Sequence, residues 1–280
     1  MNFSNRFNFL MYLYVILFFF FLLTPLVVIS ILAFNDASYI GFPFKGFTLD
    51  WFFGDEKRVG VFNNEELLNS IYISFKTGII VSLVSLFIGL FSSLYFEKSN
   101  SKIKNFFYYF GISPLIIPGV ILGIAILTYT SEIVMFLNNK EIFAFDDYLS
   151  PGFWLVVIGQ ISFISSYSML IIMAQLKKFD PTLEEAALSL KATKFEVLRY
   201  IIIPFLKPSL IKAFFAGFLL SFSNFNTTVF LVGSDPTLPI YLFSQVKYSL
   251  TPVVNAVSFL VIISITLLGI INFFIQRGKK

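Results

Sequence analysis

The chain has 280 residues, of which 57% are hydrophobic and only 13% charged, and its formal net charge is +4. A soluble globular domain is roughly 45–50% apolar and about 25% charged, so much of this chain must be solvated by lipid. Cysteine, histidine and the P-loop pattern are absent, which excludes disulfides, thiolate or imidazole metal sites, Cys- or His-based catalysis and a nucleotide-phosphate loop. We therefore expect a non-catalytic membrane protein that binds no metal or cofactor itself.

Six apolar stretches are each long enough to span a bilayer, which requires about 20 residues. The first exceeds the roughly 7–15 apolar residues of a signal-peptide core and is followed by no small-x-small cleavage site, so we expect it to be retained. The pattern predicts an all-α polytopic protein of about six transmembrane helices, forming a single domain over 1–280. In chain order, the expected spans are 9–34, 70–96, 106–129, 153–176, 209–232 and 255–275.

Basic residues are concentrated on one side of this predicted topology. Placing the N-terminus in the cytoplasm leaves 11 of the 16 acidic residues outside, where they form either a solvated surface or one that attracts a partner or a cationic substrate. The positive-inside rule then predicts that both termini are cytoplasmic, so the net charge is a topology signal and not a nucleic-acid footprint. The inside segments hold 14 of the 20 basic residues, namely Arg6, Lys98, Lys102, Lys104, Lys177, Lys178, Lys191, Lys194, Arg199, Lys207, Lys212, Arg277, Lys279 and Lys280.

The third expected span contains residues that weaken a helical hydrogen-bond ladder. Pro114, Pro118, Gly119 and Gly123 lie within ten residues of one another. Such a segment either bends and lines a cavity, or packs its small residues tightly against a neighbouring helix. Both interpretations stay open at the level of the sequence.

The inside segment 177–208 has helical signals of its own and is long for a connection between helices. Asp180 is a suitable N-cap, and Pro181 suits the first helical position. Glu184 and Glu185 would lie near the positive end of the helix dipole. We therefore predict a short helix that begins at Pro181 on the cytoplasmic face.

A second short helix is predicted from 194 to about 202, with Pro204 and Pro208 ending it and turning the chain back into the membrane. The first helix would present an apolar, small-residue surface. Small residues favour contact with another protein over anchoring in lipid headgroups, which is the alternative. The stripe consists of Leu183, Ala186, Ala187 and Leu190.

This segment resembles the EAA loop of bacterial ABC importer permeases. The resemblance is carried by Glu185-Ala186-Ala187, Ala192, Phe195, Ile203-Pro204 and Pro208. It implies a type I ABC importer fold in which the loop 177–208 supplies a coupling helix that sits in a groove of the ATPase subunit. One residue departs from the pattern, because Lys191 replaces the usual glycine. A left-handed glycine ends such helices, so lysine predicts a different turn, at a cost of about 1 kcal/mol, or a compensating change in the partner.

Other stretches resemble permeases of the spermidine/putrescine type, in particular the second of two paired subunits. Related permeases for iron, thiamine or other small solutes share several of these features, and they remain the alternative. The stretches that carry the resemblance are 25–35, 46–52, 69–70, 114–123 and 237–241.

The fifth expected span carries a run of polar side chains. Amides and hydroxyls in hydrocarbon are costly unless they face a partner or water. They therefore either line a translocation path, together with Pro114 and Pro118, or form hydrogen bonds between helices. Polyamine-type relatives often have an acid near Asn224, so the amide weakens the case for a cation site here. The residues are Ser221, Ser223, Asn224, Asn226 and Thr227.

The resemblance implies an assembly in the bacterial cytoplasmic (inner) membrane. Its expected partners are two copies of an ABC ATPase that carry the ATP and Mg²⁺, a second homologous permease subunit, and a periplasmic or extracellular solute-binding protein; no nucleic acid is expected. A stand-alone secondary transporter and a non-transporting membrane scaffold are the rival classes. Neither explains the loop at 177–208, and the expected spans contain no central acidic residue and no visible repeat.

Overall fold

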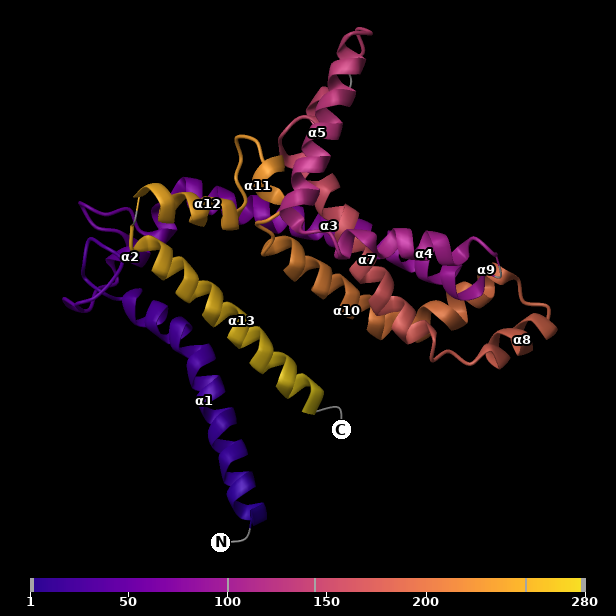
Figure 1. The fold of residues 1–280 in the computed structure, drawn as a ribbon, viewed down its shortest axis with the longest axis horizontal. Helices are drawn as coiled ribbons and strands as arrows, with labels where there is room; N and C mark the ends of the chain where they lie inside the picture. Colours follow the sequence, from indigo (N-terminus) through magenta and orange to yellow (C-terminus); the bar gives the residue numbers. More distant parts are fainter. Residues whose placement is uncertain (1–2, 100, 144, 250, 278–280) are drawn as a thin grey trace. The chain divides into compact units, whose positions relative to one another are not determined.

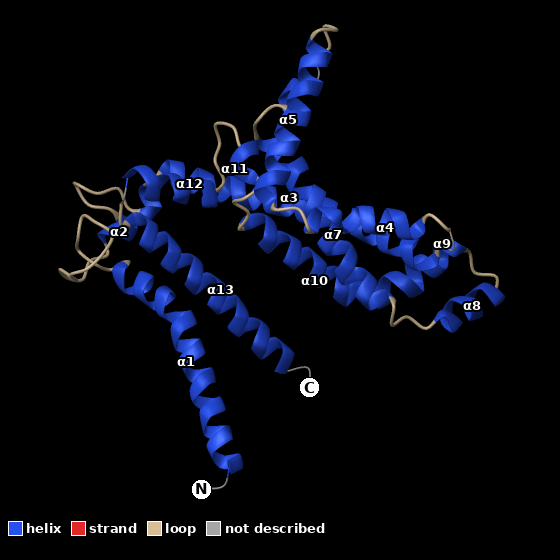
Figure 2. Cartoon of the chain, in the orientation of Figure 1, coloured by secondary structure: helices blue, strands red, loops and turns tan. Residues whose placement is uncertain are grey.

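The computed structural model is helical, and no β-strand occurs in the part of the chain that it describes (Figure 2). The predicted all-α class is confirmed. Lys279 and Lys280, which the orientation argument uses, lie outside that part. The described residues are 3–99, 101–143, 145–249 and 251–277.

Five helices among the described residues are long and apolar enough to cross a membrane, and a shorter apolar stretch at 253–267 lies within α13 (Val253–Arg277). Together they account for the about six helices of the predicted polytopic fold. The fourth has the predicted bounds. The five are α1 (Phe3–Leu32), α3 (Glu65–Lys98), α5 (Gly119–Asn138), α7 (Phe153–Leu176) and the continuous helix at 194–222.

The third membrane helix differs from its expected bounds because proline interrupts the 106–129 stretch. A short helix, α4 (Lys104–Ile112), runs into a 3₁₀ turn at Ser113–Leu115. Pro118 then adopts an extended conformation as the N-cap of α5, and the residue before a proline is biased away from helix as well. The long helix therefore begins at Gly119 and continues to Asn138.

The fifth membrane helix also differs from the expected 209–232. It begins at Lys194 with α9 (Lys194–Val197), continues through a π-helical turn at Leu198–Ile202 and ends with α10 (Ile203–Phe222). The residues after Phe222 leave the helix, and α11 (Thr228–Leu231) follows. Serine, asparagine and threonine compete for backbone hydrogen bonds, which explains the early end.

The prediction that Pro204 and Pro208 end the second short helix is wrong, because both lie inside the continuous helix. Pro204 has no N–H to donate, and its ring crowds the carbonyl four residues earlier. The preceding turn is π-helical, with wider i→i+5 spacing, and that geometry accommodates the proline. The chain therefore enters the membrane segment without a break.

The chain divides into two compact units. The first comprises residues 1–68 and 242–280, and in it α1 and α13 pack side by side (Figure 1). The ring of Phe34, just after α1, is tilted against that of Phe52 in α2 (Asp50–Phe53) and meets that of Phe259 in α13 edge to face, with ring centroids 5.2 and 4.8 Å away. This aromatic cluster joins the two long helices to the connecting segment. That segment also includes a 3₁₀ turn at Val61–Asn63.

The connection at 33–63 is organised around Asn35. Its side-chain amide donates to the carbonyls of Gly41 and Pro43, at 3.1 and 3.3 Å, and accepts from the Lys45 amide at 2.8 Å. The Trp51 indole donates to the Asn35 carbonyl at 2.8 Å. The connection therefore has a defined conformation held by buried polar contacts.

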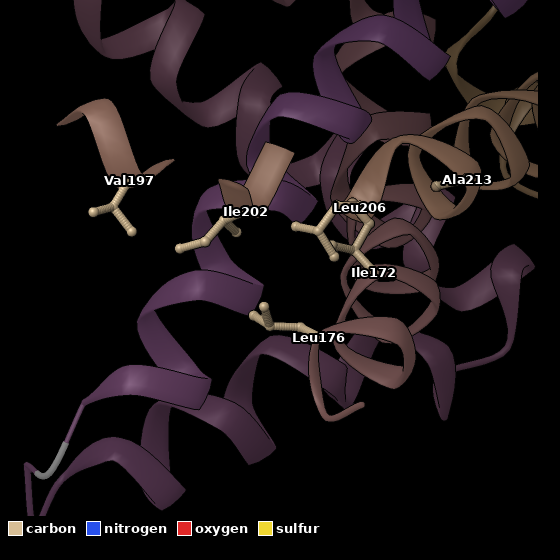
Figure 3. Packing of buried hydrophobic residues seen from close by; sticks show 6 residues of the cluster. All are labelled: Ile172, Leu176, Val197, Ile202, Leu206 and Ala213. Atoms are coloured by element: carbon tan, nitrogen blue, oxygen red, sulfur yellow. The ribbon is translucent and has the colours of Figure 1, made fainter. Parts of the chain in front are cut away.

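The second unit comprises residues 69–241 and is built around α7, which packs mainly against α10. In Figure 3, Ile172 and Leu176 of α7 converge with Ile202 and Leu206, and all four are buried. The remaining short helices are α6 (Asp146–Leu149), α8 (Pro181–Ser189) and α12 (Leu238–Ser244). The last residues of α12 belong to the first unit, and a π-turn at Gln245–Ser249 follows them. That 1–280 forms one permease domain stays a prediction.

Candidate functional site

The segment 177–208 folds as the sequence predicts at its start. Asp180 caps α8, and its carboxylate accepts hydrogen bonds from the Thr182 amide at 3.0 Å and the Thr182 hydroxyl at 2.8 Å. Pro181 occupies the first helical position. The proposed cap is confirmed, since it satisfies donors that would otherwise have no partner at the helix start.

The cap makes the start of α8 sensitive to acid. The hydrogen bonds from Thr182 lower the pKa of Asp180 below its usual value. A depressed carboxyl pKa stabilises the fold above the unfolded pKa of about 3.9, and this stabilisation is lost as the pH falls through the folded pKa. We expect the protection of the amides at the start of α8, relative to their intrinsic exchange rates, to fall below pH 4 in wild type. The Asp180→Asn variant keeps an acceptor that does not titrate, so its protection should show no such fall.

The helix ends in a Schellman motif in which Lys191 adopts the left-handed conformation that glycine usually supplies. Its φ is +65°. The Lys191 amide donates to the Leu188 carbonyl at 2.9 Å, and the Ala192 amide donates to the Ala187 carbonyl at 3.1 Å, which is the complete pattern. The expectation of a different turn is therefore wrong: the turn is kept, and lysine adopts its unfavourable backbone geometry.

Replacing Lys191 by glycine should stabilise this turn, because a non-glycine residue costs about 1 kcal/mol in the left-handed region. We expect the amides of Lys191 and Ala192 to exchange about fivefold more slowly in the variant, measured by hydrogen exchange. Lys194→Gly is the matched control. Lys194 is the first residue of α9 and has no positive φ, so glycine there relieves no left-handed strain, and the amides of residues 191 and 192 should exchange as in wild type.

The second helix begins at a capping box that the sequence analysis missed. The Thr193 hydroxyl accepts from the Glu196 amide at 3.2 Å, and the Glu196 carboxylate accepts from the Thr193 amide at 2.7 Å. The signal was available as the spacing Thr-x-x-Glu. Together with the Schellman motif, it fixes the angle between α8 and α9.

The predicted apolar stripe on α8 is divided between two surroundings. Ala187 of the stripe is partly buried and packs, together with Ala192 beyond the helix, against the chain's own cluster around Leu176 and Ile202. Leu190, by contrast, is 85% exposed. Four of the exposed apolar residues of the segment make up what we call the α8 surface, namely Leu183, Ala186, Leu190 and Phe195.

A groove of about 380 Å³ separates the turn from the following helix. Its walls include Leu190, Lys191 and Tyr200. On the other side of α8, Glu184 accepts two hydrogen bonds from the Lys98 ammonium at the end of α3, at 2.6 and 2.8 Å. Glu185 is exposed. The segment is thus held against α3 while its apolar surface stays uncovered.

The polar run after α10 forms a buried network around Gln160, a residue of α7 that the sequence analysis did not single out. The Ser221 hydroxyl donates to the Gln160 side-chain carbonyl, and the Gln160 amide donates to the Thr228 hydroxyl at 2.8 Å. The Thr228 hydroxyl in turn donates to Asn224 at 2.9 Å. Ser221 therefore takes part in interhelical hydrogen bonding, as the second sequence interpretation expects, and Asn224 joins the network only through its neighbour Thr228. Ser223 is exposed and donates to its own helix, at the Leu219 carbonyl.

The non-helical residues 223–227 between α10 and α11, which we call the α10 break, also line a cavity of about 230 Å³. Pro114 contributes one wall, Asn224, Asn226 and Thr227 another, and Tyr167 a third. The structure thus brings together the two groups proposed for a translocation path. Pro118 is the N-cap of α5 and does not line the cavity, although the next residue, Gly119, does. Whether a solute passes here stays a prediction.

No group of three or more His, Cys, Asp or Glu residues suited to a metal ion occurs in the described part of the chain. The expectation that the chain itself binds no metal and no cofactor stays a prediction.

Comparisons with known proteins find similarity to membrane components of transport systems. Residues 85–278 match the family model described as binding-protein-dependent transport system inner membrane component. The chain is 26% identical over 281 residues to the spermidine/putrescine transport system permease protein PotC of Haemophilus influenzae, covering 99% of this chain and 97% of that one. It is 22% identical to the putrescine transport system permease protein PotI of Escherichia coli K12, covering 93% and 88%.

A solved structure has the same fold. It is a bacterial ABC transporter involved in the import of the acidic polysaccharide alginate, with a TM-score of 0.78 and 15% identity, covering 99% of this chain and 97% of that chain. At this identity the match establishes the fold alone.

Proposed function

Because this chain belongs to the family of binding-protein-dependent transport system inner membrane components, we propose that it is the permease subunit of an ATP-driven polyamine importer. The observation that carries the substrate is its similarity, over 99% of its length, to a spermidine/putrescine permease. Such a subunit is not an enzyme. It contributes half of a translocation path, while a separate ATPase hydrolyses ATP and an external protein delivers the solute.

The α8 surface is the proposed contact with the ATPase. Large exposed apolar side chains on a short helix favour a protein partner, and the two flanking caps hold this helix in a fixed orientation. The contact with α3 through Lys98 and Glu184 connects the helix to the membrane segment. A movement of the ATPase against α8 would therefore be transmitted to α3 and to the continuous helix at 194–222.

The cavity beside the α10 break is the proposed part of the path contributed by this chain. Its amide and hydroxyl groups suit hydrogen bonding to a polar solute, and it contains no carboxylate. Specificity for a polycation would then rest mainly with the binding protein. Of the outside acidic residues, two already lie close to the Arg58 guanidinium: Asp36 pairs with it at 2.7 Å, and the Asp50 carboxylate lies 3.6 Å from it. These two are less available to attract a cation.

Reconstitution with the cognate ATPase, second permease and binding protein tests the proposal. We expect ATP-dependent uptake of labelled spermidine or putrescine into proteoliposomes, and no uptake without the ATPase. ATP-dependent uptake of thiamine or iron in place of polyamines would reassign the substrate. Uptake that needs no ATPase would instead favour a stand-alone secondary transporter.

A further inference from the structure

A small basic cavity lies where the end of α3, the start of α4 and the end of α7 meet. Its volume is about 230 Å³. Neither the α10 break nor the α8 surface includes any of its residues. Its walls include Phe96, Lys104, Asn105, Tyr108, Met173 and Lys177.

Two lysines give this cavity its charge. Lys104 is half-buried, and its ammonium donates to the Ser99 carbonyl at 3.1 Å. Lys177 is exposed and caps the end of α7. Neither forms an ion pair among the described residues, whereas the nearby Lys98 is paired with Glu184. The carboxylate of Glu97 also lines the cavity and opposes an anion, but it offsets only one of the two positive charges.

The rest of the cavity is apolar and aromatic. Phe96 and Met173 belong to a buried cluster against which Tyr108 packs, and the rings of Phe96 and Tyr108 meet edge to face at 5.7 Å. The hydroxyl of Tyr108 and the amide of Asn105 add neutral donors. The floor is thus rigid, and the rim offers two ammonium groups with further hydrogen-bond donors.

The adjoining face of α4 suits the boundary between headgroups and acyl chains. It exposes four aromatic side chains within five residues, namely Phe106, Phe107, Tyr109 and Phe110. Aromatic rings concentrate at that boundary, where one end of a group is apolar and the other is wet. The basic cavity therefore lies beside a surface suited to acyl chains.

We propose that this cavity binds the phosphate of an anionic phospholipid, with Lys104 and Lys177 contacting the phosphate and the acyl chains lying along α4. Basic pockets between transmembrane helices are known to bind such headgroups. The shared chemistry is a phosphate ester, which free phosphate also offers. The aromatic face of α4 favours the lipid, because only the lipid has chains that can cover it. The inference requires the chain to span a membrane and does not depend on the transported solute.

Native mass spectrometry of the full-length chain in detergent, titrated with phosphatidylglycerol, tests the site. We expect one bound lipid in wild type. In Lys104→Gln/Lys177→Gln the affinity should fall about 30-fold, since each lysine near a membrane surface contributes about fivefold. Lys104→Arg/Lys177→Arg should retain binding. The matched control is Lys102→Gln/Lys178→Gln, which removes the same charge from exposed lysines outside the cavity and should bind normally.

Three results would overturn the proposal. Equal phosphatidylglycerol binding in the cavity variant and the control variant would show that the cavity is not involved. Equal binding of phosphatidylcholine would show that the anionic charge is irrelevant. Displacement of the lipid by millimolar inorganic phosphate would assign the site to free phosphate.

Discussion

Replacing Leu190 by glutamate is expected to abolish capture of the ATPase by the purified permease while leaving membrane insertion and thermal unfolding unchanged. Leu190 is 85% exposed and contacts the solvent at the end of α8, so the chain itself loses little packing. In a docked complex the new carboxylate would be buried without a partner, which is costly. A central interface residue contributes about 2–4 kcal/mol, so the affinity should fall on the order of 100-fold. Co-purification of the ATPase measures this.

Leu188→Glu is the matched control for this prediction. It makes the same substitution in the same helix, but a period of 3.6 residues places Leu188 about 160° around the axis from Leu190. Leu188 is also partly exposed. Capture should persist in this variant. If Leu190→Glu captured the ATPase as well as wild type, α8 would not be the docking helix.

Replacing Gly123 by alanine should destabilise the second unit, because α5 packs there against the backbone of the α10 break. A Cβ at this position would lie 2.7 Å from the Thr227 carbonyl oxygen, closer than real side chains approach. Backbone cannot rotate away as a side chain can, so either α5 or the 223–227 segment must shift. Overpacking of this kind costs about 1–3 kcal/mol. Polyamine uptake should fall too, since Thr227 lines the cavity.

Gly111→Ala provides the reference for Gly123→Ala. Gly111 lies in α4, and a Cβ there would meet nothing within 4 Å. Both variants gain the same helix propensity, so the difference between their unfolding temperatures reports the clash alone. Equal unfolding temperatures would mean that the close contact between α5 and Thr227 does not constrain the fold.

Local signals explain why part of the candidate site could be predicted. The cap at Asp180 and Pro181 depends on residues adjacent in the chain, and the structure has it as expected. The left-handed conformation of Lys191 was harder to predict, because the hydrogen bonds of the turn outweigh the intrinsic preference of lysine for negative φ. The same holds for Pro204, whose helix-breaking tendency is accommodated by a π-turn that ends two residues earlier, at Ile202. Intrinsic propensity is a weak prior once neighbouring contacts compensate for it.

No pattern of neighbouring residues predicted the contacts between segments that are distant in the chain. Gln160 is one of several polar residues in α7, and only its burial opposite Ser221 and Thr228 identifies it as the centre of a network. Ala187 and Leu190 belong to one sequence stripe, yet one packs inward and the other is exposed. The helical period gives a face, but it does not say which neighbour covers each part of it.

The sequence by itself determined the helical class, the approximate membrane segments and the family. Hydrophobic runs of membrane length and a local loop motif can be recognised because each depends only on consecutive residues. Only the tertiary structure decided where the third and fifth membrane helices begin and end, and which side chains meet at the α10 break. Proline and asparagine permit several backbone paths. The path taken depends on the carbonyls, glycines and hydroxyls that another helix brings within hydrogen-bond or van der Waals distance.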